Sequence, residues 1–570
     1  LIGGTATYLT NPIASGYAGG QNRQLQRVFS FNNRIDFDLS RSIPGLAFHT
    51  NLSFDFLTLY DQFISNTYSA YEPTWSATED RIVSLKKYGE DVRSGTQNVG
   101  NASYRRRIGF YGLLDYNKNV DDVHQITGSM LAYLTNDKVQ GDIQGNKNAN
   151  LGLRLGYGFK NKYLIDFSGA VVNSVKLPAN NRTAFSPSLG LAWVMSSEGF
   201  MSSVSFVDYL KIRVSAGLMN SDNGISGFYN YDERYTSSGS YSWYEGTRSR
   251  AGVVAQNGGN PNLAFEKRNE LNIGFQSLLF GNRLSLDANV FTSLYYDQIT
   301  RPQTIYPNYF STFIPYRNFE DNAYRGAELG LAYRENWGDF RLVVGANMLY
   351  ADSKVKKRDE LYATSNRNRT GQPVDARFGL ASDGFFNSRS DIESHETQAF
   401  GTVKPGDIKY KDQNGDGIID ANDEVRIGRW QAPFSYGLNL RLSYKNLTLF
   451  ARGNGRMGAD GEISNNYFWV DGDDKYSTFV LNRWTEATQA TATFPRLSSI
   501  ANTNNYRSSD FWLYRDNYFT VDRVQLTYAV PVKVSNKLNM KGFSVFADAS
   551  NLVMISKFRQ FKELNIGSEP

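Results

Sequence analysis

The segment FSYGLNLRLSY, residues 434–444, alternates apolar and polar side chains without interruption. A period of two sustained over eleven residues indicates a β-strand with one apolar and one polar face, because successive side chains of a strand point to opposite sides. Aromatic residues stand at both ends of the apolar face with leucines between them, while the polar face includes Asn439 and Arg441. Such a strand is typical of transmembrane β-barrels, which face lipid on one side and a polar interior on the other.

The same alternation recurs in about sixteen segments of the length that a tilted membrane strand needs, roughly nine to eleven residues or more. The clearest are Lys211–Met219, Leu284–Thr292, Arg341–Tyr350 and Asp522–Val530. The chain has no run of 18 apolar residues and its mean hydropathy is −0.46, which excludes helical membrane spans. We therefore predict an all-β fold, a transmembrane antiparallel up-and-down β-barrel.

The links between the predicted strands alternate in length along the chain. Short links fall at residues 160–162, 281–282, 336–338 and 445–446, and long ones near residues 59–103, 220–268, 297–322, 352–432 and 454–517. Tight turns on one side of the membrane and long loops on the outer side produce this parity, whereas a soluble sandwich has no reason to sort its loops in this way. Residues 352–432 are thus predicted to form an extracellular loop.

Within that loop, residues 412–423 match most of an EF-hand calcium loop. Asp412, Asn414 and Asp416 stand at positions 1, 3 and 5 and Gly417 follows at position 6, where oxygen ligands can converge on a hard cation and glycine allows the sharp turn. The pattern predicts a structural Ca²⁺ site with six ligand positions: Asp412, Asn414, Asp416, Ile418 through its carbonyl, Asp420 through water, and Asp423.

The match is incomplete at its last position. Asp423 stands where glutamate is usual, and a shorter carboxylate is less suited to bind a cation through both oxygens. No amphipathic helix flanks the loop, so a helix-loop-helix sensor is not indicated. A solvated turn rich in Asp, Asn and Gly, joining two strands, is the alternative interpretation.

Another long link, residues 220–268, is rich in aromatic residues. Tyr241, Trp243 and Tyr244 lie close together in it, and planar rings with a polar edge can stack on sugars or hold peptide side chains. We take these three as candidate substrate contacts. The alternative is that they pack the loop against its neighbours.

Composition and motifs argue against several other functions. The net charge of +5 is spread along the chain without a basic block, so nucleic acid binding is not indicated. Cysteine is absent, which excludes disulfides and thiolate chemistry. His49, His124 and His395 lie far apart and belong to no catalytic motif. We expect no enzymatic activity.

Several ordered segments together resemble the SusC/RagA family of TonB-dependent outer-membrane transporters of Bacteroidetes-type bacteria. Their order and spacing, from about Asn173 onward, are more specific than any one of them. They are Phe185–Trp193 followed by Ser196–Glu198, Tyr209–Gly217, Asn260–Glu266, Tyr324–Leu329, Gly406–Gly428, Asn482–Thr485 and Asn551–Leu552.

The resemblance implies a barrel of about 22 strands with an N-terminal plug and a SusD-like lipoprotein over its outer mouth. Family members import oligosaccharides or oligopeptides with energy from the TonB complex, and often form a dimer of transporter-lid pairs. On this basis residues 1–570 are expected to be the barrel domain, incomplete at both ends, with the plug outside this sequence.

Two alternatives remain open from the sequence. The barrel could be a passive porin, or a scaffold or adhesin in a larger cell-envelope assembly. The predicted interior residues Arg441, Asp287 and Asn289 are mixed in charge and do not select a substrate class.

Overall fold

A computed structural model describes residues 1–142, 144–310, 312–472, 474, 476–537 and 539–564 of the chain. One antiparallel sheet of 16 strands dominates the fold, and its strands follow one another in chain order. Among the described residues, no helix is long and apolar enough to cross a membrane.

The strands of this sheet are β1 (Gly20–Asp38), β2 (Leu46–Ser65), β5 (Asn98–Val120), β6 (His124–Val139), β7 (Asn146–Phe159), β8 (Tyr163–Asn173), β9 (Thr183–Val194), β10 (Val207–Ser221), β13 (Glu266–Leu279), β14 (Leu284–Thr300), β15 (Arg317–Trp337), β16 (Phe340–Lys357), β23 (Phe434–Tyr444), β24 (Leu447–Met457), β27 (Tyr518–Ala529) and β28 (Ser544–Ile555). The predicted strand at residues 434–444 is therefore β23, with identical bounds.

Smaller elements occupy the links. Two-stranded sheets pair β3 (Ala70–Trp75) with β4 (Ile82–Tyr88), β11 (Arg234–Trp243) with β12 (Arg248–Asn257), β17 (Ala376–Gly379) with β22 (Val425–Arg429), β18 (Ser382–Phe385) with β20 (Ile408–Tyr410), β19 (Thr397–Gln398) with β21 (Ile418–Ile419), and β25 (Asp460–Glu462) with β26 (Leu513–Arg515). Short α-helices are α1 (Pro12–Ala18), α2 (Arg389–Glu393), α3 (Val532–Lys537) and α4 (Arg559–Leu564).

The chain divides into two compact units. Residues 1–118, 127–154 and 170–175 form the first, and residues 119–126, 155–169 and 176–570 form the second. In the first unit, β1 and β2 pair without a register shift from Gly20, opposite Ser65, to Asp38, opposite Ala47. The helix before β1 starts at Pro12, and the Asn11 side chain accepts the Ala14 amide proton at its N-terminus (2.7 Å).

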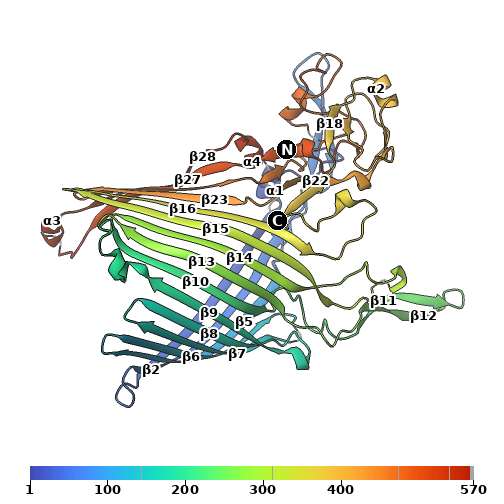
Figure 1. Cartoon of the computed structure of the whole chain (residues 1–570). Coiled ribbons are helices and arrows are strands. Elements are labelled where there is room, and N and C mark those ends of the chain that lie inside the picture. The colour runs from blue at the N-terminus through green and yellow to red at the C-terminus, as the bar shows by residue number, and fades with distance from the viewer. Residues whose placement is uncertain (143, 311, 473, 475, 538, 565–570) are drawn as a thin grey trace. The chain divides into compact units, whose positions relative to one another are not determined.

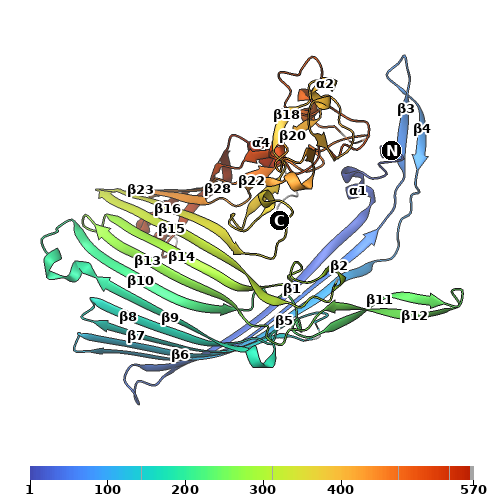
Figure 2. The same ribbon diagram turned by 45° about the vertical axis from the view of Figure 1, so that its right-hand side comes forward.

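The second unit shows why these residues form strands. In the β23–β24 pair, Leu440 lies opposite Ala451, whereas Asn439 lies opposite Arg452. Because directly opposite residues of an antiparallel pair share a face, the apolar and polar sides of neighbouring strands coincide. Figure 1 and Figure 2 show β10, β13, β14, β15, β16 and β23 side by side in this order.

Each of the four clearest predicted strands is confirmed. Lys211–Met219 lies inside β10 and Arg341–Tyr350 inside β16, while Leu284–Thr292 begins β14. Asp522–Val530 lies in β27 except for its last residue, because that strand ends at Ala529. The four segments alternate over most of their length, with exceptions such as Met219 and Phe291, and the register extends this alternation across the sheet.

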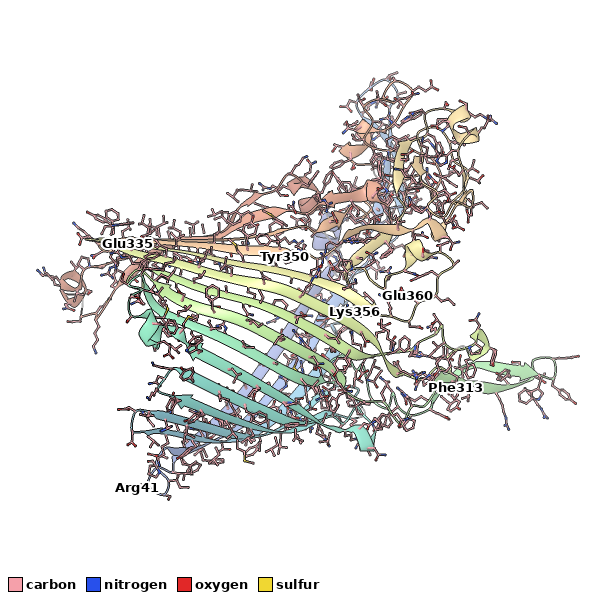
Figure 3. All side chains as sticks on the ribbon, viewed as in Figure 1. Arg41, Phe313, Glu335, Tyr350, Lys356 and Glu360 are labelled. Atoms are coloured by element: carbon pink, nitrogen blue, oxygen red, sulfur yellow. The ribbon has the colours of Figure 1, made fainter. Side chains whose placement is uncertain are left out.

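Loop lengths also alternate as expected. In the second unit, β15 and β16 are joined by residues 338–339, but β16 and β23 by residues 358–433. Figure 3 shows Glu335 beside the short turns, whereas Phe313, Lys356 and Glu360 lie at the opposite end of these strands, where the long links begin. One link departs from the parity, since residues 140–145 between β6 and β7 are short in a position where a long loop was expected.

Two of the long links of the second unit fold together around one hydrophobic core. This core, here called the loop core, consists of Leu380, Ile408, Tyr410, Ile419, Val470, Val480, Phe494 and Trp512. Its residues come from both residues 358–433 and residues 458–517. Burial raises the pKa of the Tyr410 hydroxyl, which donates to the Asn504 carbonyl (2.9 Å). These links are therefore packed structure and not loose connections.

Candidate functional site

The predicted metal loop runs between β20 and β22 and folds through bonds to its own backbone. Asp412 Oδ1 accepts from the amides of Asn414 (3.1 Å) and Gly415 (2.6 Å), and Oδ2 accepts from Gly417 (2.9 Å). The Gly417 and Gly415 amides hold the pKa of Asp412 below its ordinary value. Gly417 has a φ of +81°, so the glycine at position 6 allows the turn as the pattern predicted.

The second half of the loop ends in a buried carboxylate. Asp423 has no exposed surface, and its oxygens accept the amides of Gln413 (2.7 Å), Asn414 (3.2 Å) and Asp420 (2.8 Å). The Asp420 side chain accepts the Asn422 amide proton, and Asp420 and Asp423 together form a capping box. Asp423 thus closes the loop upon itself and links its two ends.

The middle positions of the loop also bond within it. Asn414 Oδ1 accepts from the Asp416 amide (2.8 Å), and Asp416 Oδ1 accepts from the Ile418 amide (2.9 Å). The Ile418 side chain is exposed, whereas Ile419 is fully buried in the loop core and anchors the loop. Over the described residues, no three His, Cys, Asp or Glu side chains are grouped as a metal site. These bonds are the ones that the Asp, Asn and Gly turn would make, and Ca²⁺ binding stays a prediction.

The aromatic candidates lie on a separate β-hairpin. Tyr241 and Trp243 belong to β11, and Tyr244 stands in the turn with a φ of +58°. All three are exposed, Tyr244 by 76%, and the Arg248 guanidinium lies 5.5 Å from the centre of the Tyr244 ring. Figure 2 shows this hairpin extending beyond the ends of β10 and β13. Their role as substrate contacts stays a prediction.

The predicted interior residues share the polar face of the main sheet. Arg213 of β10 reaches Asp287 of β14 (2.6 Å) across Gly274 of β13, which has no side chain in the way. Asn289 donates to Asn272 (3.3 Å). The Arg441 guanidinium lies 5.9 Å from the centre of the Phe450 ring. The polar face is therefore mixed in charge, as the sequence indicated, and Arg213 and Asp287 form an ion pair on it.

The two packed links, residues 358–433 and 458–517, also share a polar network that the sequence did not reveal. Asp407 is fully buried and accepts from the side-chain amides of Asn502 (3.0 Å) and Asn505 (2.9 Å), while the Arg496 guanidinium pairs with it at 2.8 Å. The Asn505 side chain in turn accepts the Ile408 amide proton (2.8 Å). The partners lie about ninety residues apart in sequence. The signal in the sequence for buried hydrogen-bonding side chains at this place is the polar run NTNN at residues 502–505.

The histidines lie in separate places. His49 contacts Asp36 (2.5 Å), His124 contacts Tyr157 (2.8 Å), and the His395 ring meets Phe386 edge to face. These contacts join neighbouring strands or pack a loop, and the structure brings no two of the three histidines into contact among the described residues.

Sequence comparison identifies relatives of one kind. TonB-dependent receptor P26 of Formosa agariphila is 26% identical over 449 residues, which cover 75% of this chain and 43% of that protein. TonB-dependent receptor SusC of Bacteroides thetaiotaomicron is 22% identical over 428 residues, covering 71% of this chain and 40% of that protein. The chain thus spans about two fifths of the length of these curated relatives. No protein-family model matches it.

Structural comparison gives a concordant result. The RagAB peptide importer in its open-open state superposes with a TM-score of 0.74 at 18% identity, over 97% of this chain and 60% of that chain. A second structure, the RagAB peptide transporter, gives 0.72 at 20% identity, over 96% and 60%. At these identities the match shows the fold, and it confirms the all-β prediction. Relatives and fold together confirm the resemblance carried by the ordered segments: this chain is similar to the TonB-dependent receptors of the SusC/RagA type.

Proposed function

We propose that this chain forms the membrane wall of a TonB-dependent importer that carries a bulky nutrient, an oligosaccharide or an oligopeptide, across the outer membrane of a Bacteroidetes-type bacterium. The observation that carries the proposal is the 16-stranded antiparallel sheet whose apolar and polar faces continue from strand to strand. A wall of this kind suits lipid on one side and a polar cargo on the other.

The partners of the whole protein belong to the proposal as well. We expect a SusD-like lipoprotein to cover the outer mouth and the TonB complex to act through a region outside this sequence, with transporter-lid pairs associating as dimers. The names of the similar proteins, TonB-dependent receptors, support the coupling to TonB. The lipoprotein and the dimers are proposed from the resemblance to the SusC/RagA family. Those names describe receptors and transporters, and we propose no enzymatic role.

Uptake by cells tests the function. The gene is deleted, and accumulation of radiolabelled oligopeptides and oligosaccharides is followed with and without a protonophore. An importer coupled to TonB predicts that deletion abolishes uptake of one nutrient class and that the protonophore does so in the parent strain. Uptake that persists in the presence of the protonophore would favour a passive porin. Unchanged uptake after deletion would favour a scaffold or adhesin.

Purification of the full-length protein in detergent tests the partners. The proposal predicts that a lipoprotein is recovered in equal amount with the barrel, and that mass spectrometry finds a bound peptide or sugar. Recovery with adhesion or secretion components alone would contradict it.

We also propose that residues 412–423 bind Ca²⁺ as a structural ion. Six positions of the loop match the calcium pattern, and Asp412 and Asp423 already bring the two ends of the loop together. Bound Ca²⁺ would stabilise the folded loop core by mass action, by about 2.7 kcal/mol at a hundredfold excess over Kd.

Limited proteolysis of residues 358–433 checks this proposal. We expect 1 mM Ca²⁺ to slow cleavage relative to EDTA, and Asp412→Asn to abolish the difference. Asp383→Asn is the control, since Asp383 lies in the same link and pairs with Lys411 at 3.6 Å outside the metal loop. Equal cleavage with Ca²⁺ and EDTA, with no calcium found by elemental analysis, would show that the loop is only a turn.

A further inference from the structure

A cavity of about 470 Å³ opens between two segments of the packed outer links, residues 400–404 and residues 496–504. Ligand sites in proteins measure about 300–1,000 Å³, so a short chain end fits. The lining of the cavity is distinct from the metal loop and from the aromatic hairpin. None of its lining residues belongs to residues 412–423 or to β11 and β12.

The walls of this cavity, here called the outer pocket, are held in place by direct bonds. The Thr503 hydroxyl donates to the Phe400 carbonyl (2.5 Å), and the Arg496 amide donates to the Gly406 carbonyl (2.9 Å). Beneath them, buried Asp407 accepts from Asn502, which is itself 8% exposed and lines the pocket. The pocket is therefore preformed, which lowers the entropy cost of binding.

A tight turn presents one cationic side chain at the rim. Lys404 begins the turn, the Asp407 amide donates back to its carbonyl (3.0 Å), and Pro405 and Gly406 (φ +90°) occupy the middle positions, as in a type II turn. The Lys404 amide also donates to Asp407 Oδ2 (2.7 Å), which fixes the backbone at this point.

The charges of the outer pocket do not cancel. Arg496 is neutralised by Asp407, but among the described residues Lys404 forms no ion pair and is exposed. The hydroxyls of Thr402 and Ser499, also lining residues, bond to no other group over the described ranges, whereas the neighbouring Ser498 hydroxyl accepts from the Ile500 amide. One free ammonium with two free hydroxyls is a set of donors that recognises a carboxylate.

Part of the remaining lining is apolar, beside the polar residues Ser498, Asn502 and Asn504. Leu497 and Ala501 line the pocket, and Ile500 does so while 72% exposed. An exposed isoleucine beside a lysine leaves apolar surface that a ligand can cover. A ligand with a carboxylate and an adjoining apolar group matches both parts of the lining.

We propose that the outer pocket binds the C-terminal carboxylate of a peptide whose last residue is apolar. Lys404 pairs with the carboxylate, Thr402 and Ser499 donate to its oxygens, and Leu497 and Ile500 cover the terminal side chain. The proposal rests on the proposed import function and assigns peptides as the substrate class. An acidic sugar also carries a carboxylate, but it has no apolar side chain to cover Ile500.

Competition binding on the full-length protein tests the proposal. The probe is a hexapeptide that ends in leucine and carries a fluorophore at its N-terminus, followed by anisotropy. Competitors are the unlabelled peptide, its C-terminal amide, the same peptide ending in serine, and trigalacturonate. We expect the amide and the serine peptide to bind at least tenfold more weakly than the free leucine peptide, and trigalacturonate not to compete.

Single variants distinguish peptide binding in the outer pocket from binding elsewhere on the protein. Lys404→Met should weaken the binding of the peptide with a free C-terminal carboxylate about tenfold and leave the binding of the C-terminal amide unchanged. Lys356→Met is the matched control, an exposed lysine of β16 outside the pocket that should bind as the parent does. Equal binding of acid and amide, no effect of Lys404→Met, or competition by trigalacturonate alone would each overturn the proposal.

Failure of the outer pocket and failure of the import function are distinguishable. If Lys404→Met cells take up peptides as the parent does while deletion abolishes uptake, the pocket assignment is wrong and the transporter stands. If deletion itself leaves uptake unchanged, the proposed function is wrong.

Discussion

Arg429 shows how a single side chain attaches the long link of residues 358–433 to the sheet. Its guanidinium donates to both oxygens of buried Asp375 at 2.9 Å and reaches Asp352 of β16 at 3.2 Å. The Ser353 hydroxyl and the Gln431 amide also donate to Asp375. The two ends of residues 358–433 are thus tied to β16 through one carboxylate.

The pKa of Asp375 sets the lowest pH at which this attachment is stable. Burial alone would raise the pKa of Asp375, but the bonds from Arg429 outweigh it and hold the pKa below its ordinary value of 3.8. The stabilisation is therefore fully present above pH 3.8 and is lost as the pH falls through the lowered pKa. The protection of amides 358–433 against hydrogen exchange, relative to their intrinsic exchange rates, should be unchanged at pH 5 and should fall only below about pH 4.

Asp375→Asn should remove this acid transition. Because Arg429 loses the closer of these two carboxylate partners and keeps Asp352, we expect a loss of about 2 kcal/mol in local stability at pH 7. Asp383→Asn, at an exposed carboxylate of the same link, should change stability by less than about 1 kcal/mol. The same exchange rates as the parent in Asp375→Asn would contradict this account of the attachment.

Gly406 stands in the turn between Lys404 and Asp407, close to the Trp484 ring. It has a φ of +90°, and a Cβ there would lie 2.8 Å from Arg496 Cβ and against the Trp484 ring. Gly406→Ala should cost about 2–4 kcal/mol, from backbone strain together with overpacking. Gly384→Ala, at φ +84° with nothing within 4 Å, should cost about 1–2 kcal/mol from strain alone. Equal losses in thermal unfolding would show that the Trp484 contact is unimportant.

At the scale of single elements, β24 depends on rings from both neighbours. The Phe519 ring of β27 lies over Gly453, and the Tyr436 ring of β23 lies over Gly455, each 2.5 Å from where a Cβ would stand. The two rings stack with centres 5.8 Å apart and 7° between their planes. Glycine in these strands therefore leaves space that aromatic side chains fill across the sheet.

A bulkier residue at this position should disrupt the ring pair. Gly453→Val should lower the temperature at which the full-length protein loses its folded mobility in unheated detergent gels, because Phe519 must leave its position. Gly437→Ala is the control, since its Cβ would meet only the Gly453 carbonyl at 3.9 Å. If both variants behave alike, the rings do not stabilise this part of the sheet.

The elements differ in how far sequence could predict them. β10, β14, β16 and β23 follow from alternation within each segment, which is a local property. The loop core does not, since Asp407 finds Asn502 and Asn505 across about ninety residues, and an isolated NTNN run resembles any polar loop. The metal loop lies between these cases: its turn was predicted from six positions, but the self-bonded carboxylates of Asp412 and Asp423 appear only in three dimensions.

In the whole molecule, the order of the strands determines on which side of the sheet the long links lie. Strands that follow one another in chain order need only short turns on one side, which leaves the other side free for long links that carry function. The register keeps apolar positions on one face from β9 through β27, as in the pairs of Val214 with Leu191 and of Leu449 with Leu526. The outer pocket and the metal loop both belong to the long links of the second unit.

If this sheet separates lipid from a polar interior, reagents must reach the two faces of β23 from different surroundings. The chain has no cysteine, so Leu438→Cys, Asn439→Cys, Leu440→Cys and Arg441→Cys can each be placed alone in the full-length protein in cells. We predict that a membrane-impermeant maleimide small enough to enter the interior labels positions 439 and 441, whereas a lipid-soluble maleimide labels positions 438 and 440. Labelling of all four positions by the impermeant reagent, or of none by the lipid-soluble one, would contradict a membrane wall.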